Sequence, residues 1–135
     1  MSTVCCVIKA PPEPIYRACT DLTSIVQWRV PQAMTGKLDR VDGSNYRVSL
    51  TYPDGRADGY EATVIERVPN ARIVERIRFD AADRAGEMTM TTTLRAVEGG
   101  TEVSILYEGL PSSIRPEDNE EGTRQALAKL ARFVG

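Results

Sequence analysis

The hydrophobic pattern of this chain changes its period once, and that change limits the folds open to it. From residue 34 to residue 107, apolar residues recur mostly at every second position, as in half-buried β-strands. Near the end, Thr123, Leu127, Leu130 and Val134 recur at i, i+4, i+7 and i+11, as on one face of a long helix. We therefore expect a fold in which one long helix covers the apolar face of a sheet.

Six strands in succession are predicted from the alternating region. The segments are residues 34–41, 45–52, 59–68, 72–79, 87–94 and 101–107. Turn signals separate several of them, including Asp42-Gly43, Pro69-Asn70 and Gly99-Gly100. Consecutive strands with short connections form an antiparallel meander. Residues 3–8 are rich in β-formers and predict a further strand before it.

Two short helices are predicted between the first strand and the meander. Their apolar residues form two bursts, Ile15, Ala18 and Cys19, then Leu22, Ile25, Val26 and Trp28. Pro11 and Pro12 suit the start of the first helix, and Asp21 suits the N-cap of the second. Each helix is too short to be stable alone. We expect them to close one end of the sheet and support the long helix, with Trp28 as the anchor where helix meets sheet.

Length and charge indicate one ordinary globular domain over residues 1–135. The net charge of −2 and pI near 5.2 argue against a nucleic-acid-binding surface. No apolar stretch reaches the roughly 18 residues of a membrane span, and the first residues lack the pattern of a signal peptide. We expect a cytoplasmic monomer or homodimer.

The chain has no histidine, which excludes Ser-His-Asp triads, Cys-His pairs and histidine metal sites. It also lacks CxxC, GxGxxG and P-loop motifs, so we expect neither a metal nor a cofactor. Cys5 and Cys6 are adjacent in a predicted strand and would point to opposite faces. With Cys19, we interpret them as buried small apolar residues rather than a redox site.

Four stretches carry a resemblance to a known family. They are IKAPPEPIYRACTDLTSIVQW, ATVIERVPNARIVERIRF, TMTTTLRAVEGGTEVSILYEG and the closing EGTRQALAKLARFV. Their order and spacing resemble the START-like (SRPBCC) superfamily, which includes birch-pollen-allergen proteins and polyketide cyclases. More narrowly, the chain looks like the branch of activator-of-heat-shock-ATPase (AHSA-type) homologues. It differs from the pattern at Tyr107, where the family often has histidine, and after Gly122, where aromatic residues often follow.

The resemblance implies an α+β helix-grip fold. In this fold a seven-stranded antiparallel sheet wraps around a long C-terminal helix, with two short helices after the first strand. It also implies a cavity between the sheet and the long helix for an apolar or amphipathic, lipid-like molecule. It does not fix an activity, because functions differ widely on this fold.

Residues predicted to face such a cavity are unusually rich in tyrosine and methionine. A plain core prefers leucine, isoleucine, valine and phenylalanine, whereas methionine suits adaptable binding surfaces. The alternative is a solid core with the tyrosine hydroxyls in water at strand ends. The predicted ligand-binding residues are Trp28, Tyr46, Tyr52, Tyr60, Glu75, Phe79, Met88, Met90, Thr92, Tyr107, Leu127 and Leu130.

Glu75 is a carboxylate on a strand face otherwise formed by isoleucine and phenylalanine. If the flanking turns pair the strands symmetrically, Val64 and Thr92 flank it. A Gly99-Gly100 turn then continues the polar row to Tyr107. The alternatives are that a bulge turns Glu75 outward or that an arginine pairs with it structurally.

Three functions remain open at this point. A small-molecule binding protein leads, because one weak acid–base candidate, Glu75, is little for an enzyme. The second is a cyclase, dehydratase or lyase with Glu75 as acid or base and a tyrosine as donor. The third is a chaperone-interaction module, ranked last because the outward positions Arg47, Arg76, Arg78, Thr89, Thr91 and Thr93 suit a solvated face.

Overall fold

The computed structural model describes residues 2–29, 35–80, 87–110 and 115–134, and within these ranges it has seven strands and three helices. The elements in chain order are β1 (Ser2–Ile8), α1 (Pro12–Thr20), α2 (Leu22–Trp28), β2 (Thr35–Asp42), β3 (Asn45–Thr51), β4 (Ala57–Val68), β5 (Arg72–Phe79), β6 (Glu87–Val97), β7 (Gly100–Glu108) and α3 (Pro116–Val134). All strand pairs are antiparallel, in the order β1-β7-β6-β5-β4-β3-β2. The predicted α+β class and seven-stranded sheet are confirmed.

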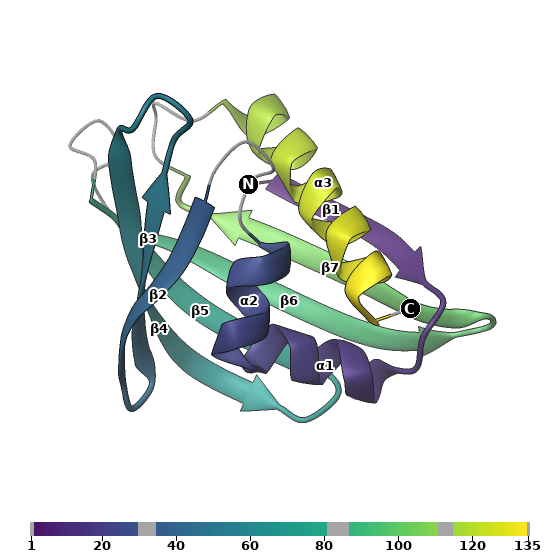
Figure 1. Ribbon diagram of the computed structural model, residues 1–135. Coiled ribbons are helices and arrows are strands. Elements are labelled where there is room, and N and C mark those ends of the chain that lie inside the picture. Colours follow the sequence, from purple (N-terminus) through teal and green to yellow (C-terminus); the bar gives the residue numbers. More distant parts are fainter. Residues whose placement is uncertain (1, 30–34, 81–86, 111–114, 135) are drawn as a thin grey trace.

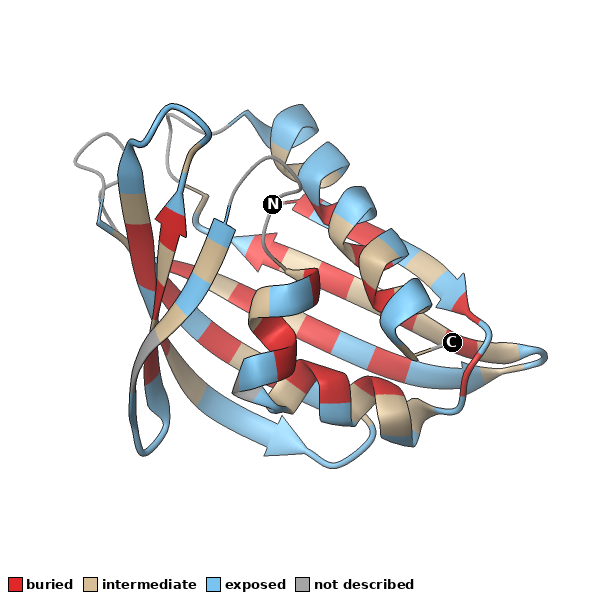
Figure 2. Cartoon of the chain, in the orientation of Figure 1, coloured by how far each residue is buried: buried red, intermediate tan, exposed pale blue. Residues whose placement is uncertain are grey.

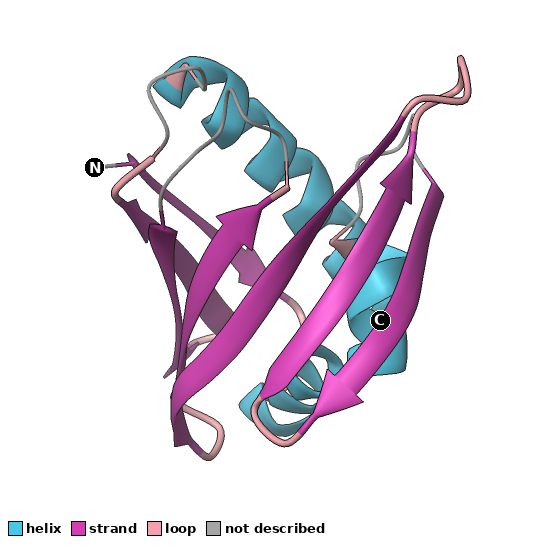
Figure 3. Ribbon diagram, turned by 90° about the vertical axis from the view of Figure 1, so that its left-hand side faces the viewer, coloured by secondary structure: helices cyan, strands magenta, loops and turns pink. Residues whose placement is uncertain are grey.

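The long helix α3 lies across the inner face of the sheet, which curves around the helices (Figures 1 and 3). It contacts β1, α1 and α2. Thr123, Leu127 and Leu130 are buried on its inner side, while Val134 is only half-buried. These three buried residues belong to the apolar face of the helix that the sequence predicts. The helix-grip arrangement implied by the family resemblance is therefore present.

The two short helices support α3, as expected. Asp21 caps α2 by accepting a hydrogen bond from the Thr23 backbone N–H at 3.2 Å. Trp28 is 1% exposed, and its Nε1 donates to the Ala18 carbonyl at 2.9 Å. The tryptophan thus joins the end of α2 to α1, so it anchors one helix to another, whereas the prediction placed the anchor between helix and sheet.

The register of the β6–β7 hairpin differs from the prediction. Val97 pairs with Gly100, so the turn residues are Glu98 and Gly99 instead of Gly99 and Gly100. Gly99, with φ of 86°, supplies the left-handed conformation that this turn needs. Moving the turn by one residue shifts the pairing by two, so that Tyr107 pairs with Met90.

The β5–β6 register also differs from the prediction by two, because Arg78 pairs with Glu87. The predicted polar row is therefore wrong in one member, Thr92. Across the sheet, Val64 pairs with Glu75 as expected, but Glu75 pairs with Met90 and Met90 with Tyr107. Thr92 is buried, but it lies between Ile73 and Ile105 in the next row. The shift of two keeps every side chain on its expected face.

Burial alternates along the central strands, with the inner residues buried and the outer ones partly or fully exposed (Figure 2). The outer face carries pairs of arginine and carboxylate, including Arg78 with Glu87 and Arg95 with Glu102. Of the outward positions predicted to be solvated, Arg76, Arg78 and Thr93 are exposed. Arg47, Thr89 and Thr91 are only half-exposed, being covered in part by neighbours.

The three cysteines are all free thiols, but only Cys19 is buried. Cys5 is exposed and Cys6 is intermediate, so the expectation of three buried cysteines is wrong for the pair in β1. In the edge strand β1, Cys5 is on the outer face in solvent, whereas Cys6 is on the inner face and only partly covered by the core. Among the described helices, none combines the length and apolar character required to cross a membrane.

Candidate functional site

A cavity of about 320 Å³ lies between the first half of α3 and the inner face of the sheet. Most of its lining is apolar or aromatic, and strands β3 to β7 all contribute to it. Exposed residues of α3, Asp118 and Gly122, stand at its mouth. The lining comprises Trp28, Arg29, Leu50, Tyr52, Tyr60, Ile77, Phe79, Met88, Met90, Ile105, Tyr107, Asp118, Asn119, Gly122, Thr123 and Ala126. A volume of this size is at the small end of cavities that hold organic ligands.

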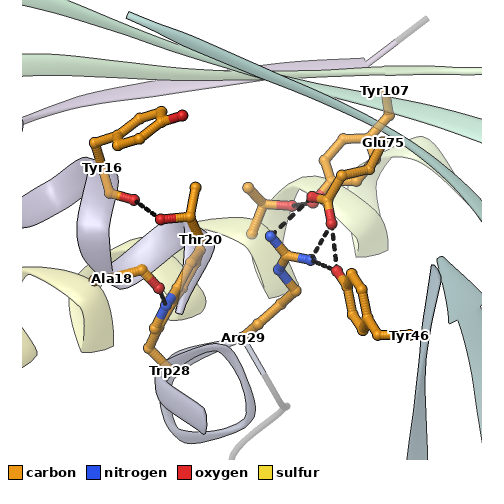
Figure 4. A network of polar contacts seen from close by, with 9 residues as sticks. Tyr16, Ala18, Thr20, Trp28, Arg29, Tyr46, Glu75 and Tyr107 are labelled. Atoms are coloured by element: carbon orange, nitrogen blue, oxygen red, sulfur yellow. Dashed lines mark hydrogen bonds and ion pairs between the residues drawn. The ribbon is translucent and has the colours of Figure 1, made fainter. Parts of the chain in front are cut away.

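A buried ion pair lies beside this cavity (Figure 4). Arg29, the residue that follows α2, donates from Nη2 to Glu75 Oε2 at 3.0 Å and from Nη1 to Glu75 Oε1 at 3.3 Å. The side chain of Glu75 is 1% exposed and that of Arg29 is 11% exposed. The Tyr46 hydroxyl accepts from Arg29 Nη1 at 2.9 Å and donates to Glu75 Oε1. The pair is bidentate, the geometry that best compensates two buried charges.

The environment of this network shifts two of its pKa values. Burial alone would lower the pKa of Arg29, but Glu75, Tyr46 and Tyr60 together outweigh burial and raise that pKa well above its usual value. Burial raises the pKa of Tyr46 far above 10; the Arg29 cation opposes this rise and Glu75 adds to it. At neutral pH the network therefore contains an arginine cation and a neutral tyrosine.

The sequence leaves two alternatives for Glu75: an outward turn at a bulge, or a structural pair with an arginine. The structure shows the pair with an arginine. Strand β4 has a bulge next to Glu75, between Val64 and Glu66, but its effect is to expose Ile65. Glu75 itself points inward and pairs with Arg29. Both of its oxygens accept hydrogen bonds inside this network.

Of the three tyrosines that border the cavity, Tyr60 and Tyr107 are buried. Burial raises the pKa of Tyr60 and that of Tyr107. The Tyr107 hydroxyl shares a hydrogen bond of 3.1 Å with Thr123 Oγ1, which joins β7 to α3. Thr123 also donates to the Asn119 carbonyl at 2.8 Å. These contacts fix the first half of α3 at its distance from the sheet.

Seven of the twelve predicted ligand-binding residues line the cavity: Trp28, Tyr52, Tyr60, Phe79, Met88, Met90 and Tyr107. The other five, which do not line it, are Tyr46, Glu75, Thr92, Leu127 and Leu130. Tyr46 and Glu75 are engaged with Arg29, next to the cavity, while the other three are buried in the packed interior. Whether the seven bind a ligand remains a prediction.

The sequence reasoning missed the polar part of the lining. Arg29 comes directly after the predicted second helix, and no local pattern indicates that it turns inward. Asn119, Gly122 and Ala126 recur at intervals of three and four residues, which places them on one stripe of α3. That stripe was detectable, but its residues are small or polar and resemble an ordinary exposed face.

The described residues contain no group of three or more Cys, Asp or Glu side chains that could hold a metal ion. The ionisable side chains of the cavity lining are one arginine, one aspartate and three tyrosines. The arrangement can surround an apolar molecule and offer it a few hydrogen-bonding groups.

The comparison with family models matches residues 9–135 to the model described as Activator of Hsp90 ATPase homolog 1-like protein. The chain belongs to this family. The Activator of Hsp90 ATPase homolog 1-like proteins are START-like, so the resemblance seen in the sequence is confirmed at the level of fold and family. No match was found among curated proteins.

Solved structures share this fold. The protein CV1439 from Chromobacterium violaceum is 33% identical, with a TM-score of 0.92 over 98% of this chain and 94% of that one. A protein from Rhodobacter sphaeroides is 22% identical, with a TM-score of 0.83 over 98% of this chain and 90% of that one. DynU16, from the dynemicin biosynthetic locus, is 20% identical, with a TM-score of 0.70. The match to DynU16 covers 98% of this Activator of Hsp90 ATPase homolog 1-like chain but only 46% of DynU16.

Proposed function

We propose that this protein binds an apolar or amphipathic small molecule in the cavity between α3 and the sheet. The observation that carries the proposal is the cavity itself, about 320 Å³ of space with a largely apolar lining and exposed residues at its mouth. Protein interiors are normally close-packed, with few voids larger than a water molecule. A cavity of this size, bordered by the adaptable side chains of Met88 and Met90, therefore supports a ligand site.

The alternative of an enzyme with Glu75 as acid or base receives less support from the geometry. Glu75 does not border the cavity, and its two oxygens already accept hydrogen bonds from Arg29 and Tyr46. A general base must reach the proton it removes, directly or through one water. We therefore assign Glu75 to the positioning of Arg29 rather than to chemistry.

The geometry also gives less support to the alternative of a chaperone-interaction module. A docking face of that kind needs an exposed apolar or charged surface that lacks internal partners. The outer face of the sheet instead carries arginines paired with carboxylates of neighbouring strands, such as Arg72 with Glu66 and Arg78 with Glu87.

Native mass spectrometry of freshly purified protein tests the proposal, because it detects a bound molecule whatever its identity. We expect a population whose mass exceeds that of the chain by a few hundred daltons, and loss of this excess under denaturing conditions. A parallel test uses the neutral fluorescent probe N-phenyl-1-naphthylamine, whose emission should rise when it enters the cavity.

The matched variants for this test are Met90→Trp and Ile65→Trp. Met90 is 2% exposed and lines the cavity, whereas Ile65 is 46% exposed on the outer side. Met90→Trp should abolish probe uptake while the protein stays folded, since the added ring has space to enter. Ile65→Trp should bind the probe like wild type. Loss of folding in Met90→Trp, at a cost of about 1–3 kcal/mol or more, would indicate a solid core instead.

A further inference from the structure

The charges around the cavity compensate one another inside the protein. Arg29 and Asp118 are the charged side chains of its lining, and Asp118 is exposed at the mouth. The Arg29 cation already forms a bidentate pair with Glu75. An ionised ligand would therefore lose its hydration without meeting an uncompensated charge of opposite sign, which is costly.

Three polar atoms in the lining side chains have no hydrogen-bond partner among the described residues. They are Arg29 Nε, the Tyr60 hydroxyl and Asn119 Nδ2, and each is buried. Tyr60 as a whole is 6% exposed. Nearly all buried polar groups in folded proteins have a partner, and an unmet donor costs free energy. Because Arg29 lies close enough to donate to the Tyr60 hydroxyl, the donors left without an acceptor are the Tyr60 proton and Asn119 Nδ2. These two donors point to a partner that the protein itself does not provide.

All three atoms can donate a hydrogen bond, and they belong to three different parts of the wall around the cavity. Arg29 follows α2, Tyr60 is in β4 and Asn119 is in α3. The remaining lining, including Ile77 and Ile105, is mostly apolar. The cavity lining thus combines a few hydrogen-bond donors with a mostly apolar remainder.

The Arg29 guanidinium is close enough to donate to the Tyr60 hydroxyl, and both its charge and this contact oppose the rise of the Tyr60 pKa that burial causes. A guanidinium can only donate hydrogen bonds, whereas a tyrosine hydroxyl can both donate and accept. Arg29 therefore cannot accept the Tyr60 proton, and this proton stays available to an acceptor on a ligand.

We propose that the cavity selects an uncharged molecule with an apolar body and an acceptor oxygen, such as a ketone, ester or amide carbonyl, over the carboxylate of the same shape. This inference rests on the proposed binding function and adds the chemical class of its ligand. The donors named above would pair with the carbonyl oxygen, and the compensated Arg29–Glu75 pair would leave no site for an anion.

Three naphthalene derivatives of nearly equal shape test this selectivity. They are 2-acetylnaphthalene, the apolar 2-isopropenylnaphthalene and, at pH 8, anionic 2-naphthoate. Their dissociation constants are measured by displacement of N-phenyl-1-naphthylamine. We expect the ketone to bind about 3- to 10-fold tighter than the hydrocarbon, the effect of one hydrogen bond. It should bind more than about 10-fold tighter than the carboxylate, whose charge would be buried without a partner.

A pair of variants connects the selectivity to a named donor. Tyr60→Phe removes one hydroxyl and keeps the ring, so it should reduce the preference for the ketone over the hydrocarbon. Tyr16→Phe makes the same change in α1, outside the cavity lining, and should leave that preference unchanged.

The outcomes separate this inference from the proposed function. Equal binding of ketone and hydrocarbon, or tightest binding of the carboxylate, would overturn the selectivity while the binding function stands. An unchanged ketone preference in both tyrosine variants would show that Tyr60 is not a donor to the ligand and would also count against the assignment. If the probe does not bind at all, the proposed function fails, and the inference fails with it.

Discussion

The two ends of the layer between α3 and the sheet are built from similar elements but packed differently. At the packed end, Ile15, Val103 and Leu130 are completely buried, and none of them borders the cavity. At the open end, Tyr60 and Met88 border about 320 Å³ of space, although they too are buried. The contrast indicates that the packed end stabilises the fold while the open end is available for a ligand.

The Arg29–Glu75 pair lies at the border between these ends, and its removal should have the largest effect. We expect Glu75→Gln to lower the free energy of unfolding at pH 8 by about 3–5 kcal/mol, because the Arg29 charge would stay buried without its partner. The measurement is urea denaturation. The same substitution in the outer pair, Glu102→Gln opposite Arg95, should cost about 0–1 kcal/mol. Equal costs for the two variants would show that the buried pair has no special structural role.

Truncation at the packed end should have the next largest effect. Leu130 is 0% exposed, so Leu130→Ala should cost about 2–5 kcal/mol and leave probe binding intact. Met88→Ala, at the open end, should cost less than Leu130→Ala because Met88 already borders empty space. Urea denaturation of both variants checks the order. A larger cost for Met88→Ala would contradict the division into two ends.

The buried tyrosines make a prediction for alkaline pH. In the unfolded chain a tyrosine has a pKa of about 10. In the folded state the pKa values of Tyr46, Tyr60 and Tyr107 are raised above this value. The folded protein therefore binds more protons above pH 10. Their stabilising contribution is complete below pH 10 and is lost as the pH rises above it, by up to about 1.4 kcal/mol per pH unit for each tyrosine.

Urea denaturation between pH 9 and pH 11 measures this slope. Tyr60→Phe should show a shallower decline than wild type, because one of the three groups no longer titrates. If the variant declines as steeply as wild type, Tyr60 does not contribute to the effect.

The fold could be predicted from the sequence because its determinants are local. The change of hydrophobic period indicated the sheet and α3, and Asp21 marked the start of α2 as expected. The registers of β5–β6 and of β6–β7 were each missed by two residues. In the second case either Glu98-Gly99 or Gly99-Gly100 could form the turn, and the choice moves Tyr107 from Thr92 to Met90.

The candidate site was predictable only for its apolar part. Alternation along the strands placed Tyr60, Met88 and Met90 on the correct face, which is a local property. The pairing of Arg29 with Glu75 joins residues 46 positions apart, and nothing near Arg29 indicates its partner. The open space at Gly122 likewise depends on how α3 lies over the sheet.

The final comparison concerns a position where stability and binding should change in opposite directions. Gly122 lies within α3 at the mouth of the cavity, and a Cβ added there would meet no atom within 4 Å. Gly122→Leu should therefore raise stability by about 1 kcal/mol or leave it unchanged, because glycine is a poor helix former. The control is Gln125→Leu, on the exposed side of α3.

The most direct test of a ligand site at the open end is N-phenyl-1-naphthylamine binding to these two variants, with urea denaturation on the same samples. We predict that Gly122→Leu remains as stable as wild type or more so but loses probe binding, since its side chain fills the mouth. Gln125→Leu should bind the probe like wild type. Undiminished probe binding by a folded Gly122→Leu variant would contradict the account, because the probe would then bind elsewhere.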